Sequence, residues 1–303
     1  MQLNQSAKFN ISRVAKKEIA LFFSSPIAFL FIGAFVAVTL FIFFWGETFF
    51  SRNISDVRPM FEWMPLLLIF LCSTLTMKLW CEEKRSGTIE FLHTLSVPLS
   101  HFVIGKFLGC LALLSIALFI TIPLPITVSI IGELDWGPVI SGYLAVLLLG
   151  STYIAIGLAV SAKSDNQIVS LISACLIGGV FYFIGTPALT DFFSHQSADF
   201  LRQLGTGSRF EDITRGVIDL RDLYYYISLT LVFLALNTYF LEKERWINNK
   251  KNSHHKQWQV ITSLLTINLI AANLWLSQLP QLRIDTTAGK QYSISEATSL
   301  YLK

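Results

Sequence analysis

Apolar residues are gathered along this chain into seven long runs separated by polar breaks. Each run is about twenty residues long, which is the length that a helix needs to cross the hydrocarbon of a bilayer. A spanning segment must satisfy its own backbone hydrogen bonds, so we expect α-helices throughout. The predicted spans cover residues 26–46, 64–80, 103–131, 138–161, 167–189, 223–241 and 259–279. The pattern therefore predicts an all-α protein that crosses a membrane several times.

The break between the second and third runs is unusually charged. It reads CEEKRSGTIEFLHTLSVPLS, residues 81–100, and its charged side chains are Glu82, Glu83, Lys84, Arg85 and Glu90. Each charge costs about 3 kcal/mol at the bilayer centre, so the five would cost about 15 kcal/mol in lipid. We therefore expect the segment in water or against a partner, with Gly87 and Thr88 forming a turn before a short helix. The charge pattern fits either a solvated loop or a docking element.

The composition also indicates a membrane protein. Of the 303 residues 53% are hydrophobic and only 14% are charged, against about a quarter charged in soluble domains. The N-terminal segment is too interrupted by charge to be a cleavable signal, so we expect the first span to stay in place. The cysteines lie in or near spans without metal-site spacing: Cys72, Cys81, Cys110 and Cys175. The net charge of +3 gives no indication of nucleic acid.

The basic residues predict the orientation in the membrane. Fourteen of them fall in segments that would share one side, and nine fall in segments on the other side. By the positive-inside rule, the N-terminus, the 81–100 loop and the 242–257 linker are expected to be cytoplasmic. The long 190–222 segment and the C-terminus are then expected outside.

Two further segments have mixed apolar and charged character. Residues 190–222 carry too many apolar side chains for a solvated loop, so we expect a re-entrant or interfacial helical pair there, including Arg215, Gly216 and Asp219. Residues 9–25 place basic and apolar side chains on different faces of a helix, which is typical of an interfacial helix. Its charged residues are Arg13, Lys16, Lys17 and Glu18, of which Glu18 interrupts the apolar stripe. The alternative is a basic flank that only orients the first span.

Patterns for catalysis are missing from the sequence. The nearest imitation of a P-loop, residues 288–291, lacks the upstream glycine and the hydroxyl residue that bind nucleotide phosphates. His254 and His255 lie beside lysines in a polar linker, which favours a solvated segment over a metal site. We expect no catalytic residue, no metal site and no directly bound cofactor. Lys78 and Lys106, near span ends, are expected to snorkel to the interface.

Several strings resemble ABC type-2 transporter permeases. EEKRSGTIEFL, followed by Gly105-Lys106-Phe107, resembles the first cytoplasmic loop of that family. The segments 17–19, 24–29, 215–219 and 224–226 resemble the starts of its first and last spans, and together they favour the gliding-motility-associated branch. The resemblance covers about residues 9–246. Two positions depart from the family pattern: the proline of the loop is displaced to Pro98, and Phe29 stands where a tyrosine is common.

The resemblance implies a six-span permease bundle, multi-pass in the bacterial cytoplasmic (inner) membrane, that works with separate subunits. Two copies, or two related chains, would enclose a pathway, and a partner ABC ATPase that binds ATP and Mg²⁺ would dock on the cytoplasmic side. The 81–100 loop would couple the two. The coupling residues expected from it are Glu82, Glu83, Lys84, Arg85, Gly87, Thr88 and Glu90. The runner-up function is a membrane scaffold or anchor for an extracytoplasmic assembly, and a channel or secondary carrier is a third alternative.

The C-terminal part exceeds a six-span permease. We expect the chain to divide into a cytoplasmic interfacial segment (1–25), a permease domain (26–246), a cytoplasmic linker (247–257), a seventh transmembrane helix (258–280) and an extracytoplasmic segment (281–303). Residues 283–285 and 290–295 resemble the start of the extracytoplasmic auxiliary protein that accompanies gliding-associated permeases. This implies a truncated fusion, or a natural protein ending at that junction; the alternative is an ordinary seventh span with a disordered tail.

Overall fold

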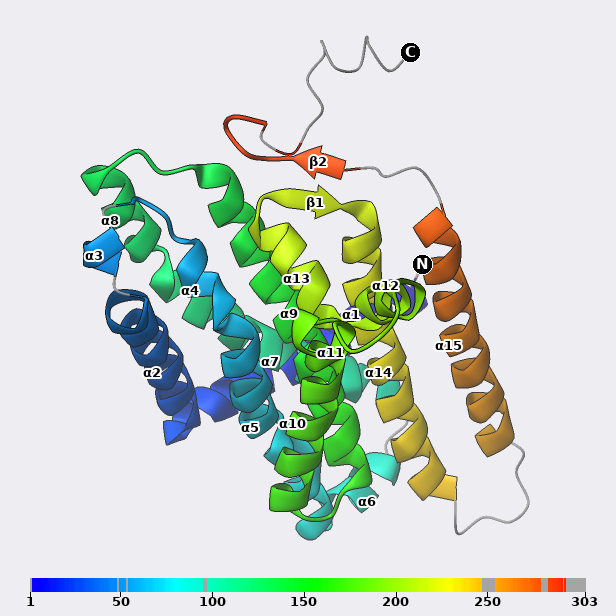
Figure 1. The fold of residues 1–303 in the computed structure, drawn as a ribbon. Coiled ribbons are helices and arrows are strands. Elements are labelled where there is room, and N and C mark those ends of the chain that lie inside the picture. The colour runs from blue at the N-terminus through cyan, green and yellow to red at the C-terminus, as the bar shows by residue number, and fades with distance from the viewer. Residues whose placement is uncertain are drawn as a thin grey trace.

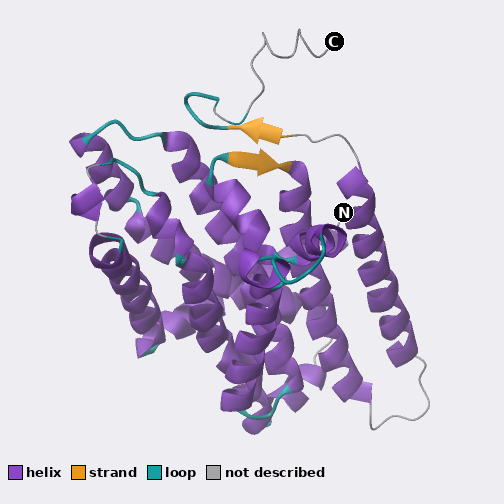
Figure 2. Ribbon diagram, viewed as in Figure 1, coloured by secondary structure: helices purple, strands orange, loops and turns teal. Residues whose placement is uncertain are grey.

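The fold is a bundle of long helices with two short strands at one end (Figures 1 and 2). A computed structural model describes residues 2–47, 49–52, 54–94, 97–246, 254–278, 283–290 and 292. The first half contains α1 (Gln2–Ser24), α2 (Pro26–Phe41), η1 (Ile42–Gly46), α3 (Phe49–Arg52), α4 (Arg58–Glu62), α5 (Met64–Arg85), α6 (Thr88–Thr94), α7 (Leu99–Thr121) and α8 (Pro123–Ile131). The second half contains α9 (Trp136–Lys163), α10 (Gln167–Phe183), α11 (Pro187–Thr190), α12 (His195–Leu204), α13 (Thr206–Thr214), β1 (Val217–Asp219), α14 (Leu220–Trp246), α15 (His254–Gln278) and β2 (Arg283–Asp285). The all-α prediction is confirmed.

The predicted spans correspond to helices of two lengths. Five helical segments in the described chain are long and apolar enough to cross a membrane: 26–51, 64–85, 99–131, 136–163 and 220–245. The runs predicted at 167–189 and 259–279 contain shorter apolar helices, Gln167–Phe183 and Gln259–Asn273. Together they are consistent with a multi-pass membrane protein.

Local sequence explains where the helices begin and bend. The Ser25 side chain accepts a hydrogen bond from the Ile27 N–H at 3.4 Å, and Pro26 occupies the first turn of α2, so the chain turns between α1 and α2. The run predicted at 103–131 is divided into α7 and α8 at Pro123, because proline cannot continue the hydrogen-bond ladder of the preceding helix. Asp135 caps α9 by accepting the Gly137 N–H at 2.9 Å.

The central helix is α9, which packs against α5, α7, α10, α13 and α14. Its glycines allow close approach. A Cβ added to Gly157 would lie 2.0 Å from the Thr76 hydroxyl oxygen, and one added to Gly150 would lie 2.3 Å from a Leu114 methyl. The described helices therefore meet in a closely packed interior rather than around an open channel.

The bundle has two ends that we name by their elements. The "α6 side" comprises the end of α5, α6, the 164–166 loop and the end of α14. The "sheet side" is the half that holds the 132–135 loop, α11 to α13, β1 and β2, with α11 and α12 nearest the middle of the bundle (Figure 1). Helix α1 packs against α7 and α2, with Val14 against Gly105 and Glu18 against Gly109. Residues 2–24 therefore form a distinct helix, as the interfacial-helix interpretation requires.

The C-terminal elements are attached to the bundle. Helix α15 packs against α14, and the Asn273 amide donates a 2.9 Å hydrogen bond to the Ser228 hydroxyl. Strand β2 then pairs antiparallel with β1, with Ile218 opposite Ile284. The alternative of a wholly disordered tail is therefore wrong for residues 283–290. The predictions for residues 247–253, 279–282, 291 and 293–303 lie outside the described residues.

Candidate functional site

The charged break predicted at residues 81–100 is a helix–turn–helix on the α6 side. Helix α5 ends at Arg85, and Gly87 adopts a positive φ of 71°, which glycine reaches without strain. The turn is closed by side chains, because the Ser86 hydroxyl donates to the Glu82 carbonyl at 2.8 Å and the Thr88 hydroxyl donates to the Glu83 carbonyl at 3.2 Å. The predicted turn and short helix are confirmed.

Two of the expected coupling residues, Glu83 and Lys84, form ion pairs with side chains of other helices. The Glu83 carboxylate forms a 2.8 Å ion pair with the Lys106 ammonium. This ammonium also forms a 3.0 Å ion pair with Glu18 and donates a 3.2 Å hydrogen bond to the Leu79 carbonyl. The Lys106 side chain is 3% exposed and lies 4.9 Å from the centre of the Trp80 ring. The expectation that Lys106 snorkels is wrong, because two buried carboxylates hold its ammonium inside the protein. This buried triad joins α1, α5 and α7.

Lys84 makes a second connection. Its ammonium forms an ion pair with Glu244 near the end of α14 and lies 3.5 Å from Asp165 in the loop before α10. The Lys84 side chain is 8% exposed. The end of α5 is therefore tied to α14 as well as to α1 and α7.

The remaining coupling residues form an exposed surface. Glu82, Arg85, Gly87, Thr88 and Glu90 are all exposed, and so is Phe91, at 66%. The Gln167 amide donates to the Glu82 carboxylate at 3.3 Å and thereby orients it at the edge of a shallow hollow. We call these six residues the "α6 patch". Its mixture of carboxylates, a guanidinium and an aromatic ring suits recognition of a protein surface.

Helix α1 separates its charges as the sequence predicted. Arg13, Lys16 and Lys17 are exposed, whereas Glu18 is buried. The interruption that Glu18 makes in the apolar stripe is explained by its partner, because its carboxylate faces Lys106. The position of α1 relative to a membrane stays a prediction.

A lateral groove of about 670 Å³ lies between the α1–α2 joint and α5. Its walls are mainly apolar, and include Leu30, Phe31, Leu71 and Leu75, while Lys78 stands at its charged end near the α6 side.

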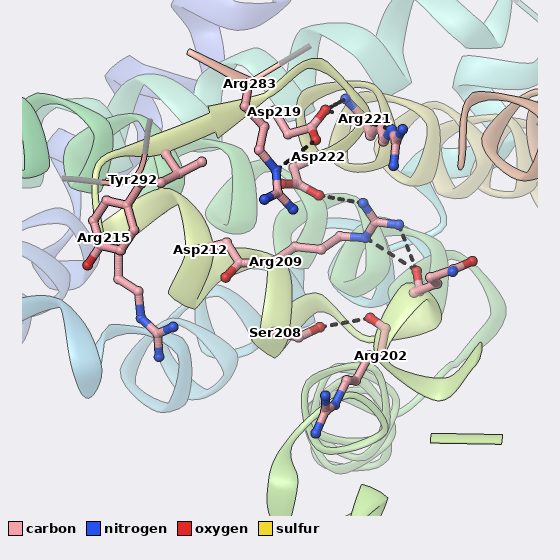
Figure 3. A pocket seen from close by; sticks show the side chains of 12 residues that line it. Arg202, Ser208, Arg209, Asp212, Arg215, Asp219, Arg221, Asp222, Arg283 and Tyr292 are labelled. Atoms are coloured by element: carbon pink, nitrogen blue, oxygen red, sulfur yellow. Dashed lines mark hydrogen bonds and ion pairs between the residues drawn. The ribbon is translucent and has the colours of Figure 1, made fainter. Parts of the chain in front are cut away.

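The sheet side holds the residues predicted in the 190–222 segment. Helices α12 and α13 form there, followed by the turn at Gly216, whose φ is 95°. A Cβ on Gly216 would lie 2.8 Å from the Thr287 methyl, so glycine allows β1 and the tail to approach. Arg215 and Asp219 line a polar cavity of about 340 Å³ together with residues of α12, α13, α14 and β2 (Figure 3).

Desolvation in the wall of this cavity raises the pKa of Asp212, against the opposing effect of the nearby Arg215, Arg283 and Arg209 guanidinium groups. A raised pKa means that this carboxylate gives up its negative charge more readily than an ordinary aspartate.

The sequence did not reveal several of these partners. Lys106, Glu244 and Asp165 lie 23, 160 and 81 residues from their partners in the chain, so no local pattern joins them. One signal was present, since a lysine within an apolar run is expensive unless paired, and Glu18 and Glu83 flank neighbouring runs. The pairing of β2 with β1 has no comparable signal.

The chain was compared with known proteins. A family model described as "ABC-2 family transporter protein" matches residues 3–274, from α1 through most of α15. None of the curated proteins matched the chain. The family match agrees with the several long apolar helices of the bundle. The chain therefore belongs to the ABC-2 transporter family and is a membrane permease subunit of an ABC transporter.

Proposed function

We propose that the chain exports a substrate across the bacterial cytoplasmic membrane and is driven by a separate ATPase that docks on the α6 patch. The observation that supports this proposal is the set of ion pairs that connect the α6 patch to the rest of the bundle. The patch is exposed to a partner on one side, while Glu83 and Lys84 beneath it tie the end of α5 to α1, α7 and α14.

Coupling of ATPase movement to the membrane helices requires a docking surface that is rigidly connected to those helices. Closure of an ATPase can move membrane helices only through a contact that does not yield, and paired charges give such a contact orientation as well as attraction. In this proposal Glu82, Arg85, Thr88 and Glu90 meet the partner, and Gly87 sets the angle between α5 and α6. ATP and Mg²⁺ are bound by the partner.

The substrate pathway in this proposal is formed with a second copy or a related chain. The interior around α9 is filled by close helix contacts, as at Gly150 and Gly157, so it offers no passage. The groove between the α1–α2 joint and α5 opens on the outside of the bundle instead. A second permease chain that covers this face would convert an open groove into an enclosed space.

The orientation in this proposal is supported by the basic residues of the α6 side and of α1. Lys84, Arg85, Lys163 and the basic end of α14 lie on the α6 side, which we assign to the cytoplasm together with α1. The sheet side is then extracytoplasmic. We also propose membership of the gliding-motility-associated branch and contact of the tail with an extracytoplasmic auxiliary domain, supported by the strings at 215–219 and 283–285.

The test is copurification from native membranes in mild detergent, with mass spectrometry for an ATP-binding subunit. The informative variant is Glu82→Lys with Glu90→Lys, because both side chains are exposed and neither belongs to the buried triad. The matched control is Glu133→Lys with Asp191→Lys, which reverses two exposed carboxylates on the sheet side.

We expect the ATPase to copurify with the wild type and the control but not with the α6-patch variant, while all three have the same elution volume and apparent Tm. Failure to recover an ATPase even after crosslinking would instead favour the non-transporting scaffold. ATP-independent substrate movement in proteoliposomes would favour a channel or a secondary carrier.

A further inference from the structure

The polar cavity on the sheet side is not used by the proposed coupling mechanism. It is lined by α12, α13, β1, the first turn of α14 and the tail, so two segments of the chain that are about seventy residues apart meet in it (Figure 3). Five of its lining side chains are arginines and three are aspartates, which gives it a formal charge of +2.

Part of this charge is neutralised within the cavity wall. Arg209 pairs with Asp222, donates to the Gln203 carbonyl at 2.9 Å, and lies 4.4 Å from the centre of the Tyr225 ring. Its guanidinium is therefore held in place by the wall. It contributes a fixed positive charge to the cavity wall, and its hydrogen-bond donors are already used within the protein.

Two other guanidinium groups are held much less tightly. The Arg283 guanidinium is 3.7 Å from one carboxylate oxygen of Asp219. The other oxygen of Asp219 already accepts a 3.0 Å hydrogen bond from the backbone N–H of Arg221. Arg215 is 3.7 Å from Glu211. Both contacts are longer than a hydrogen bond, and the two side chains are 53% and 55% exposed. Each guanidinium carries five N–H donors, so both retain donors for a ligand.

Large apolar side chains are exposed around the cavity. Leu220 and Ile284, which are chain neighbours of lining residues, are 50% and 66% exposed, and Phe192 on the same side is 86% exposed. Large apolar side chains beside a charged cavity are typical of the interface between the hydrocarbon and the head groups. At such an interface, guanidinium groups can bind the phosphate of an anionic head group through charge-assisted hydrogen bonds.

We propose that this cavity binds a phosphoryl group, to which Arg283 and Arg215 supply guanidinium donors from different parts of the lining. A guanidinium fork matches phosphate oxygens in pairs, and the charge of +2 balances a phosphate mono- or dianion. A volume of about 340 Å³ admits a phosphorylated head group but leaves acyl chains in the bilayer. The source is a membrane amphiphile or a soluble organophosphate.

The tail completes this site. Arg283 belongs to β2, and Tyr292, which follows in the chain, also lines the cavity. Pairing of β2 with β1 sets Arg283 opposite Asp219, and the Tyr292 N–H donates to Asp285 at 2.8 Å. The segment after α15 thus supplies a ligand group to the permease bundle. The site does not depend on the proposed docking of an ATPase.

The experiment is native mass spectrometry of the full chain in detergent with three probes: phosphatidylglycerol, sn-glycerol 3-phosphate and uncharged diacylglycerol. The variant is Arg215→Gln with Arg283→Gln. The control is Arg58→Gln, which removes a positive charge on the same side, where Arg58 pairs with Asp56 outside the cavity. Size exclusion and thermal unfolding establish that each variant is folded.

We expect phosphatidylglycerol to bind the wild type and the control alike, and the double variant to bind at least about tenfold more weakly, since hydrogen bonds to charged groups each contribute that much. Binding of glycerol 3-phosphate with the same loss identifies a soluble source, and binding of the lipid alone identifies a membrane source. Binding that is equal for diacylglycerol, or unchanged in the folded double variant, overturns the proposal.

Discussion

The buried Lys106 offers the sharpest test of how the α6 patch is mounted. Replacing it by methionine keeps the volume of the side chain but leaves Glu18 and Glu83 without their shared cation. The Glu18 side chain is 5% exposed, so water does not replace the ammonium there, whereas Glu83 is 21% exposed and retains partial hydration. We expect Lys106→Met to lower the stability of the chain strongly.

The size of the effect follows from the cheapest way to relieve the unpaired charges, which is protonation. A glutamic acid with a reference pKa of about 4.3 costs about 4 kcal/mol to protonate at pH 7. This agrees with the about 3–5 kcal/mol found when one partner of a buried ion pair is removed. Loss of the contact with Trp80 adds up to about 2 kcal/mol. Thermal unfolding in detergent at pH 7, followed by tryptophan fluorescence, measures this loss of stability.

Two further variants separate the buried triad from a general effect of charge. Lys17→Met removes an exposed lysine of α1 and is expected to change stability by about 0.5 kcal/mol or less. Lys106→Met combined with Glu18→Gln and Glu83→Gln removes all three charges and is expected to recover most of the lost stability. If Lys106→Met matched Lys17→Met at pH 7, or if the triple variant were no better than the single one, the reasoning would be refuted.

Three other predictions address packing, turn geometry and strand register. Gly157→Ala is expected to cost about 1–3 kcal/mol by overpacking against Thr76, and less in a Thr76→Ala background, as measured by apparent Tm. Gly87→Ala is expected to cost about 1 kcal/mol through its positive φ alone, because open space surrounds the site; an effect as large as that of Gly157→Ala would contradict this. Ile218→Cys with Ile284→Cys, in a Cys175→Ser background, is expected to crosslink within one chain under a short thiol reagent, whereas Ile218→Cys with Ala288→Cys is not; peptide mass spectrometry distinguishes the two.

The membrane helices could be predicted because their signal is local. A run of about twenty apolar residues has one stable conformation in lipid, and Pro26, Asp135 and Gly87 mark helix ends by chemistry confined to a few neighbouring residues. The turn after α5 followed from the same kind of reasoning. These features required no knowledge of which helices touch.

The sequence could not predict which charged residues of the loop are exposed and which pair with other helices. Glu82 and Glu83 are adjacent in sequence and identical in chemistry, yet one is exposed and the other faces Lys106. Which of the two turns inward depends on the rotation of α5 against α7, which is set by packing along the whole helix. The same limit applies to β2, because a strand of three residues does not contain enough sequence information to identify its partner strand.

The contacts on the two sides of the bundle have different consequences for motion. On the α6 side, the ion pairs of Lys106 and Lys84 join α5 to α1, α7 and α14, so a force applied at the α6 patch would displace several helices together. On the sheet side, β1 and β2 join the start of α14 to the chain that follows α15. Helix α14 takes part in both connections, through Glu244 at one end and β1 at the other. A displacement that begins at α6 therefore has a continuous, helical route to the arginine-lined cavity, and α14 is the element in which to look for it.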